Sequence, residues 1–329
     1  MKALVYIGPE KLDFIEVNDP TLRDGEVMVK IDSVGICGSD MHAFLGHDDR
    51  RPAPLILGHE VSGIIVDGEQ VGRRVTVNPL VTCGTCSACV SGRDNLCPDR
   101  QIISMQPREG GFAQFVAIPP SNVVAVPDDF SLEKACMAEP IACGWHAVRL
   151  AQTALDIEIS VARVLVIGGG AIGVGAALSL IAFGASDLTV LEPNEIRRKY
   201  LNKKTDLHVL DPEGLNDDIQ FDLVIDGVGF ADTRDTASKA VRPGGVIMHI
   251  GLGGSEGGLD IRRITLQEVA FIGTYTYTAA DFRATAQAMF SGKLGRLEWY
   301  EARPLSDGAK AFADIRQGAV EAPKIILKP

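Results

Sequence analysis

The sequence predicts an α/β protein that combines a β-rich N-terminal region with a doubly wound, six-stranded parallel sheet. Short runs rich in Val and Ile fill residues 1–35, and Pro20 and Asp24-Gly25 separate them, which is typical of β-strands. From Ala162 onward, six short apolar runs alternate with helical segments, the pattern of a parallel sheet covered by helices. A chain of 329 residues also exceeds one ordinary core, so two domains are expected.

The elements of the N-terminal region follow from this pattern. Strands are predicted at residues 2–7, 13–17, 26–34, 61–66, 74–77, 109–115 and 117–126. Residues 46–54 are polar and contain Gly46, Pro52 and Pro54, so they are predicted to form a surface loop. Residues 132–155 carry apolar side chains at three- and four-residue spacings, which predicts a helix.

In the second region, the strands and helices alternate. Strands are predicted at residues 163–167, 188–191, 208–210, 222–226, 246–251 and 269–273, with helices at 174–183 and 279–290 among those between and after them. A last strand at 324–328 is predicted to rejoin the first region.

Composition and charge exclude several classes of function. The chain is 46% hydrophobic and 23% charged, as in soluble globular proteins. Its net charge of −11 disfavours nucleic acid or an anionic membrane as a partner, because phosphate binding needs a basic face. Met1 runs directly into a strand-like pattern, so no signal peptide is expected. Residues 164–186 carry no charge and are long enough to cross a bilayer. Glycines crowd that stretch, however, which favours a buried strand, turn and helix.

A cluster of residues around Cys37 predicts a metal site. Within six positions the chain holds a thiol (Cys37), a hydroxyl (Ser39), a carboxylate (Asp40) and an imidazole (His42). Gly58-His59-Glu60 and Glu139 can add an imidazole and carboxylates. A catalytic Zn²⁺ with an open position needs such groups as ligands, as partners that orient the ligands, and as a route for a proton. A lone cysteine is usually a small buried hydrophobe, but these neighbours favour a ligand.

A second metal site is predicted from four closely spaced cysteines, Cys83, Cys86, Cys89 and Cys97. Four thiolates at these spacings can surround one ion, and a closed shell leaves no position for substrate, so a structural zinc is expected. The alternative is an iron–sulfur cluster, which also takes four cysteines. The chain has seven cysteines, an odd number, and the clustering of four of them favours metal binding over disulfides. A reducing, cytoplasmic location is therefore expected.

A glycine motif between a predicted strand and helix indicates a dinucleotide site. Gly168 permits the tight turn, Gly170 the approach of a pyrophosphate and Gly173 close packing of the helix, whose first amides face the phosphates. Ala171 and Ile172 complete this turn, and Gly227 and Gly251 follow later strands, near the expected nicotinamide half. Glu192, 19 residues after Gly173, can accept hydrogen bonds from ribose hydroxyls and repel a 2′-phosphate. NAD is therefore predicted over NADP, although Arg197 and Arg198 leave a phosphate partner open.

With these motifs, the whole chain resembles the zinc-dependent medium-chain dehydrogenase/reductase family. The resemblance implies a GroES-like catalytic domain at residues 1–147 with the structural-zinc lobe near 80–100. It also implies a Rossmann domain at 148–278 and a return to the catalytic domain at 279–329. It further implies a homodimer or homotetramer.

The same resemblance assigns the zinc ligands. Cys37 and His59 match two ligands, and Glu60 matches the carboxylate that sits beside the metal. Glu139 stands at the position of the third ligand, as in the sorbitol, threonine and polyol dehydrogenase branch, and Cys143 is the alternative.

Roles in the reaction follow from the resemblance too. Ser39 and His42 match a relay that carries away the alcohol proton, and Asp40 is expected to orient His59. The implied reaction moves a hydride between a secondary alcohol, such as a polyol or sugar alcohol, and NAD, giving a ketone.

Three alternatives stay open for the function. They are a dehydrogenase of simple alcohols or of amino alcohols such as threonine, a zinc-free quinone or enone reductase, and a non-catalytic dinucleotide-binding protein. Sorbitol-type members carry an arginine near residues 273–277, and this chain has none there. Tyr277, the loop 44–54 and Trp145 are expected to shape the pocket.

Overall fold

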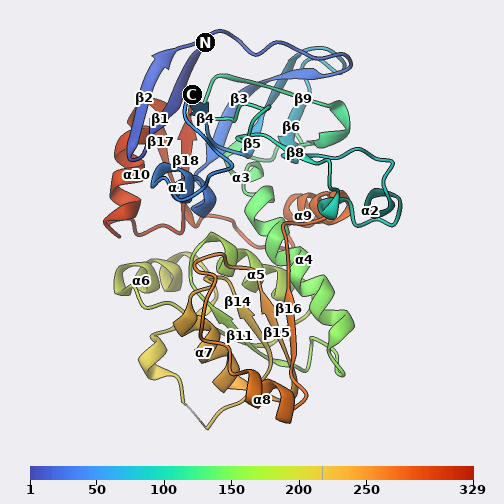
Figure 1. The fold of residues 1–329 in the computed structure, drawn as a ribbon, viewed down its shortest axis with the longest axis vertical. Helices are drawn as coiled ribbons and strands as arrows, with labels where there is room; N and C mark the ends of the chain where they lie inside the picture. The colour runs from blue at the N-terminus through green and yellow to red at the C-terminus, as the bar shows by residue number, and fades with distance from the viewer. Residues whose placement is uncertain (217) are drawn as a thin grey trace.

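The structure is a computed structural model that describes residues 1–216 and 218–329, and it forms two lobes. Figure 1 shows a β-rich lobe at the top, which holds both chain termini, and a lobe built on a parallel sheet below it. The helix α4 (Ala138–Ala154) runs from one lobe to the other.

The upper lobe is built on a largely antiparallel sheet of order β10-β6-β5-β3-β18-β17, with β9 paired to β3. A smaller sheet has the order β2-β1-β4, and β7 pairs with β8. The last strand pairs with β3, since Ile326 lies opposite Gly35 and Leu327 opposite Val34. The strands are β1 (Lys2–Gly8), β2 (Lys11–Glu16), β3 (Val27–Gly35), β4 (Leu55–Ile56), β5 (Glu60–Asp67), β6 (Arg74–Val77), β7 (Leu80–Val81), β8 (Gln101–Ile102), β9 (Phe115–Ile118), β10 (Val123–Ala125), β17 (Tyr300–Pro304) and β18 (Lys324–Lys328).

The lower lobe contains a six-stranded parallel sheet of order β13-β12-β11-β14-β15-β16. Its strands are β11 (Arg163–Ile167), β12 (Asp187–Leu191), β13 (His208–Leu210), β14 (Phe221–Asp226), β15 (Val241–His249) and β16 (Ala270–Gly273). The order reverses beside β11, and in such sheets ligands bind at the carboxyl ends of the strands at this switch point. The predicted α/β class and the six parallel strands are confirmed.

The helices cover these sheets and join the lobes. They are α1 (Gly38–Phe44), α2 (Ser87–Val90), α3 (Leu132–Ala135), α4, α5 (Ala171–Ala182), α6 (Glu195–Lys204), α7 (Ala231–Ala240), α8 (Ile261–Leu266), α9 (Ala279–Phe290) and α10 (Gly308–Arg316), with 3₁₀ turns at Asp94–Leu96, Pro120–Asn122, Pro212–Gly214 and Leu305–Asp307. α4 packs closely on α5, because a Cβ atom on Gly144 would lie 2.4 Å from the amide nitrogen of Ala176. Among the described residues, no helix has the length and apolar character needed to span a membrane.

Several predicted boundaries differ from the structure for physical reasons. Residues 109–114 form no strand, because Gly110 and Gly111 instead donate backbone hydrogen bonds to Ile56 and Gly58. The predicted strand 117–126 is split by Pro119-Pro120, since proline cannot donate to a strand ladder. The predicted helix 132–155 is broken at Cys136-Met137. The helix predicted to begin at 174 begins at Ala171, and the helix α1 was not predicted.

Candidate active site

The register of β3 and β5 assembles the first ligand group. Gly35 lies opposite Glu60, so Cys37, two residues beyond β3, comes next to His59 and Glu60 at the start of β5. One ligand atom from each of these three residues lies within 4.8 Å of the other two. Sulfur, imidazole and carboxylate ligands at this spacing suit Zn²⁺.

Glu60 is fixed by residues from opposite ends of the chain. Its side chain is fully buried, and Oε1 accepts a hydrogen bond from Nζ of Lys324 at 2.5 Å. Lys324 also donates to the carbonyl oxygen of Ile36 at 2.8 Å. Oε2 is buried without a hydrogen-bond partner in the described part of the chain, and a Cβ atom on Gly35 would lie only 1.9 Å from it. A buried carboxylate oxygen in this position fits a cation ligand.

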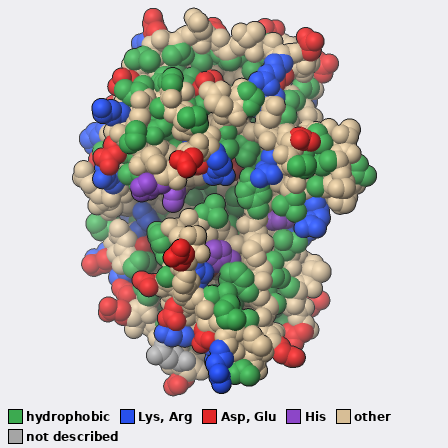
Figure 2. Space-filling view, in the orientation of Figure 1, with side chains coloured by type: hydrophobic (Ala, Val, Ile, Leu, Met, Phe, Trp, Pro, Cys, Tyr) green, Lys and Arg blue, Asp and Glu red, His purple; other side chains and the backbone are tan. Residues whose placement is uncertain are grey.

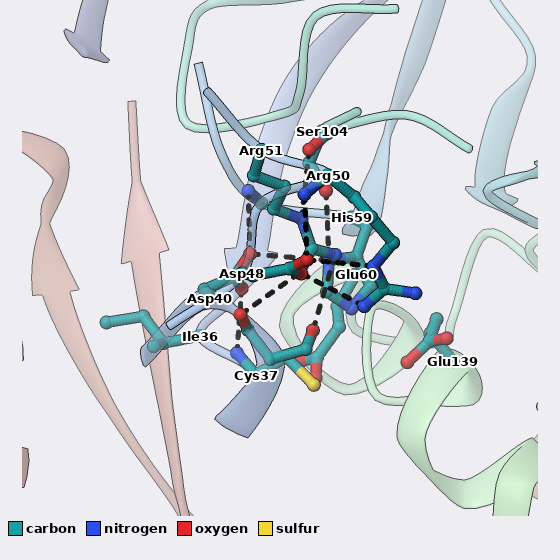
Figure 3. A network of polar contacts seen from close by, with 12 residues as sticks. Ile36, Cys37, Asp40, Asp48, Arg50, Arg51, His59, Glu60, Ser104 and Glu139 are labelled. Atoms are coloured by element: carbon teal, nitrogen blue, oxygen red, sulfur yellow. Dashed lines mark hydrogen bonds and ion pairs between the residues drawn. The ribbon is translucent and has the colours of Figure 1, made fainter. Parts of the chain in front are cut away.

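His59 is held by polar groups behind it. Its Nδ1 lies 3.4 Å from Oδ1 of Asp40 and 3.4 Å from Oγ of Ser104 (Figure 3). Burial would lower the pKa of His59, but Asp40 and Cys37 raise it well above its ordinary value. Burial would also raise the pKa of Asp40, but His59, Arg51 and the backbone amide of Cys37 lower it. Asp40 therefore stays ionised behind the imidazole.

Glu139, the predicted third ligand, lies outside this three-residue group. It is buried near the start of α4, and its Oε1 accepts a hydrogen bond of 2.7 Å from the hydroxyl of Tyr277. Burial raises the pKa of Glu139, and burial with the Glu139 charge raises the pKa of Tyr277 well above its ordinary value. The thiol of Cys143, the alternative ligand, points back to the carbonyl oxygen of Glu139 at 3.9 Å.

The predicted relay residues lie on α1 beside an arginine network. The carbonyl oxygen of Ser39 accepts from Nη1 of Arg51 at 3.0 Å, and Arg51 also pairs with Asp48 at 3.0 Å (Figure 3). His42 is half-buried, and its ring centre lies 6.4 Å from that of His47. The loop 44–54 therefore contacts α1 through Arg51, and its role in shaping the pocket stays a prediction.

The four cysteines Cys83, Cys86, Cys89 and Cys97 come together in a projecting lobe that carries α2 (Figure 1). Their ligand atoms all lie within 4.8 Å of one another. Backbone amides of Thr85 and Cys86 lower the pKa of Cys83 to about 6, while desolvation and neighbouring thiols raise that of Cys89 to about 12. Four thiols this close ionise together only around a cation, which supports the predicted metal site.

The glycine motif adopts the conformation of a nucleotide-binding turn. Gly168 has a φ of 103°, and a Cβ atom on Gly173 would lie 1.7 Å from the carbonyl oxygen of Gly168. Gly170 is the N-cap of α5, and the space around its Cβ position is open. Ala171 and Ile172 begin the helix, so the first amides of α5 are oriented toward this open space.

Glu192 lies at the end of β12 and is almost fully buried. Its Oε2 accepts from the amide of Gly169 at 3.0 Å, and its Oε1 from that of Asn194 at 2.8 Å. Nη1 of Arg197 lies 3.8 Å from Oε2, whereas Arg198 pairs with Asp211. The carboxylate is therefore held rigidly beside the glycine turn.

Gly227 and Gly251 lie at the ends of adjacent strands. A Cβ atom on Gly227 would lie 3.2 Å from the amide nitrogen of Gly173, and one on Gly251 would lie 2.1 Å from the carbonyl carbon of Val228. Both loops therefore need glycine so that three backbone segments can meet at the carboxyl edge of the sheet.

Sequence reasoning missed three residues of the site, Lys324, Arg51 and Ser104, and also the contact of Tyr277 with Glu139. Only Tyr277 had a signal in the sequence, because this tyrosine follows the last predicted strand of the parallel sheet. Trp145 was expected near the pocket, but it packs against Phe183 at the far end of α5.

A metal-type ligand group in one lobe and a glycine-rich turn at the switch point of a parallel sheet in the other are together typical of dehydrogenases. Comparison with known proteins supports this class. Residues 23–128 match the family described as alcohol dehydrogenase GroES-like domain, and residues 171–291 match zinc-binding dehydrogenase.

Individual relatives agree with the family match. The chain is 32% identical to L-galactonate-5-dehydrogenase of Escherichia coli K12, over 89% of this chain and 88% of the relative. It is also 32% identical to sorbitol dehydrogenase of Bacillus subtilis 168, over 84% and 82%. A solved alcohol dehydrogenase from E. coli CFT073, complexed with NADH, superposes with a TM-score of 0.88 and 25% identity, covering 100% of this chain and 99% of that one. The chain belongs to the zinc-dependent medium-chain dehydrogenase family.

Proposed function

We propose that this enzyme is a zinc- and NAD-dependent dehydrogenase that oxidises a secondary alcohol of a polyol, sugar alcohol or related compound to a ketone. The observation that carries the proposal is the meeting of Cys37, His59 and Glu60, with the buried Oε2 of Glu60 left without a partner in the described residues. A zinc-free quinone or enone reductase and a non-catalytic protein are disfavoured, because both sets of predicted metal ligands are retained.

Cys37, His59 and Glu60 would hold the catalytic zinc, and Glu139 is proposed as a further ligand that would exchange its hydrogen bond from Tyr277 for the metal. The bound cation would supply Lewis-acid chemistry that favours loss of the alcohol proton. The four-cysteine lobe would hold a second, structural zinc.

The chain's own residues would then orient ligands and move the proton. Asp40 would fix the tautomer of His59 from its position 3.4 Å from Nδ1. Ser39 would receive the proton from the substrate hydroxyl, and half-buried His42 would pass it toward solvent. NAD, when bound, would supply the acceptor for the hydride, and no side chain of the protein takes part in that redox step.

NAD is proposed as the cofactor because of Glu192. Its carboxylate is held by two backbone amides beside the glycine turn, where it can accept hydrogen bonds from ribose hydroxyls and would repel a 2′-phosphate. The E. coli CFT073 relative complexed with NADH supports this choice.

Polyols and sugar acids are the proposed substrate class, since the relatives act on L-galactonate and sorbitol by name. Simple alcohols and amino alcohols such as threonine are the alternative. The segment 273–277 lacks the arginine of sorbitol-type members, so sorbitol itself is not the preferred choice.

A homodimer or homotetramer is proposed as the working form. β16 is an edge strand of the parallel sheet, and Phe271 on it is 37% exposed. Leu252 and Leu266, in neighbouring segments, are more than 70% exposed. An exposed apolar edge favours association with a second copy.

A reducing cytoplasm is proposed because none of the seven cysteines forms a disulfide.

The test is a panel of polyols, sugar acids, amino alcohols and simple secondary alcohols with NAD⁺, with and without chelator. Chelator-sensitive reduction of NAD⁺ by at least one polyol or sugar acid is expected, and activity that resists full zinc removal would contradict the proposal.

The zinc content of Glu139→Ala, compared with that of Cys143→Ala, tests which of the two residues is the third ligand of the catalytic zinc. Zinc lost only from the cysteine variant would exclude Glu139.

A further inference from the structure

Arg100 is a half-buried cation with no ion-pair partner among residues 1–216 and 218–329. Its Nη1 donates to the carbonyl oxygen of Cys97 at 2.8 Å and its Nε to the hydroxyl of Tyr275 at 3.3 Å. The guanidinium carbon lies 4.8 Å from the centre of the Tyr275 ring. These contacts fix the direction of the guanidinium but leave its charge without a counter-charge, which favours an anionic ligand.

The loop that holds Tyr275 also reaches the predicted ligand group. Thr276 has a φ of 46°, in the left-handed region, so the chain turns sharply between Tyr275 and Tyr277. Tyr277 contacts Glu139, while the carbonyl oxygen of Tyr275 accepts from Nδ2 of Asn95 in the cysteine lobe at 2.8 Å. The loop 275–277 therefore connects Arg100 to Glu139 at the proposed reaction centre.

A second arginine, Arg50, also interacts with Tyr275. Arg50 is 62% exposed and binds Asp48 through Nε at 2.8 Å and Nη2 at 3.0 Å. Asp48 raises the pKa of the Arg50 guanidinium, and the Tyr275 phenol adds to the rise, so Arg50 and Tyr275 lie close enough to interact. Because Asp48 is shared with Arg51, one carboxylate faces two guanidinium groups and one positive charge is left over.

Charged side chains of both signs border the hollow between the two lobes. Figure 2 shows several Lys, Arg and His side chains around this hollow, with Asp and Glu side chains among them. In Figure 3 the guanidinium of Arg50 lies on the same side of His59 as Glu139. A chain with a net charge of −11 therefore still places cationic side chains where substrate would enter.

We propose that Arg100, assisted by Arg50, binds a terminal anionic group of the substrate, a carboxylate or a phosphate on an open polyhydroxylated chain. The inference rests on the proposed dehydrogenase function and narrows its substrate class. A guanidinium offers two parallel N–H donors to either anion, and such charge-assisted pairs are stronger than those to a neutral hydroxyl. The uncharged terminus of a polyol would leave Arg100 without a counter-charge.

The test compares substrates that differ only at one terminal carbon. kcat/KM with NAD⁺ is measured for D-sorbitol, D-gluconate and D-sorbitol 6-phosphate, and for galactitol, galactonate and galactitol 1-phosphate. The wild-type enzyme, Arg100→Met and Arg50→Met are compared with Arg93→Met, whose exposed arginine lies in the same lobe. The two anionic arms distinguish a carboxylate from a phosphate.

At least one anion is expected to exceed its neutral analogue by tenfold or more in kcat/KM. Arg100→Met should lower that preference at least tenfold, Arg50→Met by a smaller factor, and Arg93→Met should preserve it. A wild-type enzyme that uses the neutral polyol as well as both anions overturns the inference, as does a preference that survives Arg100→Met.

Binding measured without turnover separates this inference from the function on which it rests. Calorimetry with NADH-saturated enzyme and gluconate or sorbitol 6-phosphate involves no reaction, because both partners are already reduced. Arg100-dependent binding without activity on any substrate would contradict the dehydrogenase and support the anion site. Activity on neutral polyols without such binding would support the dehydrogenase and overturn the anion site.

Discussion

Nζ of Lys324 donates to Oε1 of Glu60 at 2.5 Å, and both side chains are buried. The pair joins the last strand of the chain to the strand that carries the proposed metal ligands. Burial would lower the pKa of Lys324, but Glu60 and Cys37 raise it above its ordinary value, so the lysine stays charged. Lys324 thereby holds one carboxylate oxygen of Glu60 and leaves the other toward the ligand group.

Lys324→Met is expected to weaken zinc binding at the catalytic site. Without Lys324, Glu60 loses both its fixed orientation and the charge that balances Cys37 and Glu139. Loss of a group that orients a ligand typically costs ~10–100-fold in metal affinity. Zinc per chain after dialysis against a chelator should fall toward one, since the cysteine lobe keeps its ion.

Lys328→Met is the matched control, four residues further along β18. Lys328 makes half-exposed ion pairs with Asp32 and Glu133, which contribute little to stability. This variant should keep wild-type zinc content. Equal zinc retention in Lys324→Met and Lys328→Met would mean that Glu60 needs no lysine.

Glu192→Gln is expected to change the choice of cofactor. The amide can still accept from Gly169 or Asn194, but it no longer repels a 2′-phosphate and binds ribose hydroxyls more weakly. Hydrogen bonds to a charged group contribute about 1.5–3 kcal/mol, so the ratio of kcat/KM for NAD⁺ over NADP⁺ should fall by about tenfold or more.

Glu195→Gln provides the comparison for the cofactor test. Glu195 is exposed on the first turn of α6 and, within residues 1–216 and 218–329, its ion pair is with Lys199 on its own helix, so its loss should leave the ratio unchanged. A wild-type enzyme that prefers NADP⁺ would falsify the role of Glu192.

The strands of the parallel sheet were predictable because their signal is local. Four apolar residues in a row at β11, followed by three glycines, identify strand, turn and helix without any distant contact. The cysteine lobe was predictable for the same reason, since its four thiols lie within 15 consecutive residues.

The missed parts of the site depend on contacts between distant residues. In the sequence, Lys324 resembles an ordinary surface lysine in a short strand. Its burial against Glu60 becomes visible in the structure, where β18 pairs with β3 at Leu327 and Val34. The helix α1 was missed because seven residues beginning with glycine give little periodicity. Its start is set by Asp40, which accepts from the Cys37 amide at 3.0 Å.

Cys86→Ser is expected to remove the structural zinc and loosen the contact between the lobes. The cysteine lobe holds residues 275–279 through Asn95, which donates to Tyr275, and Asp94, which accepts from the amide of Ala279 at 3.0 Å. Metal binding stabilises such a lobe directly, so zinc content should fall by one per chain and Tm should decrease.

Cys136→Ala tests whether thiol loss alone explains that result. Cys136 is buried outside the lobe, and its thiol donates to the carbonyl oxygen of Glu133 at 3.1 Å. This variant should keep both zinc ions. Full zinc content in Cys86→Ser would show that the lobe does not bind a metal.

Asp281→Asn is expected to destabilise the joint between α4 and α9 in a pH-dependent manner. Its carboxylate accepts from Nε of Arg149 at 2.6 Å and from the hydroxyl of Thr278 at 2.8 Å, and it lies 2.7 Å from Nδ1 of His146. Although burial would raise the pKa of Asp281, these partners lower it strongly. Removing the charge should cost about 2 kcal/mol of unfolding free energy at pH 7.

The sign of the pH dependence follows from the direction of that shift. A carboxyl group with a lowered pKa in the folded state contributes its full stability above the ordinary carboxyl pKa of about 3.9, and loses it as pH falls further. Urea unfolding of wild type and Asp281→Asn should therefore differ fully at pH 7 and pH 5, and the difference should shrink at pH 3. Asp235→Asn, which removes an exposed pair with Lys239, should differ little from wild type at any of these pH values. A gap for Asp281→Asn that stays constant down to pH 3 would show that the carboxylate charge does not stabilise this joint.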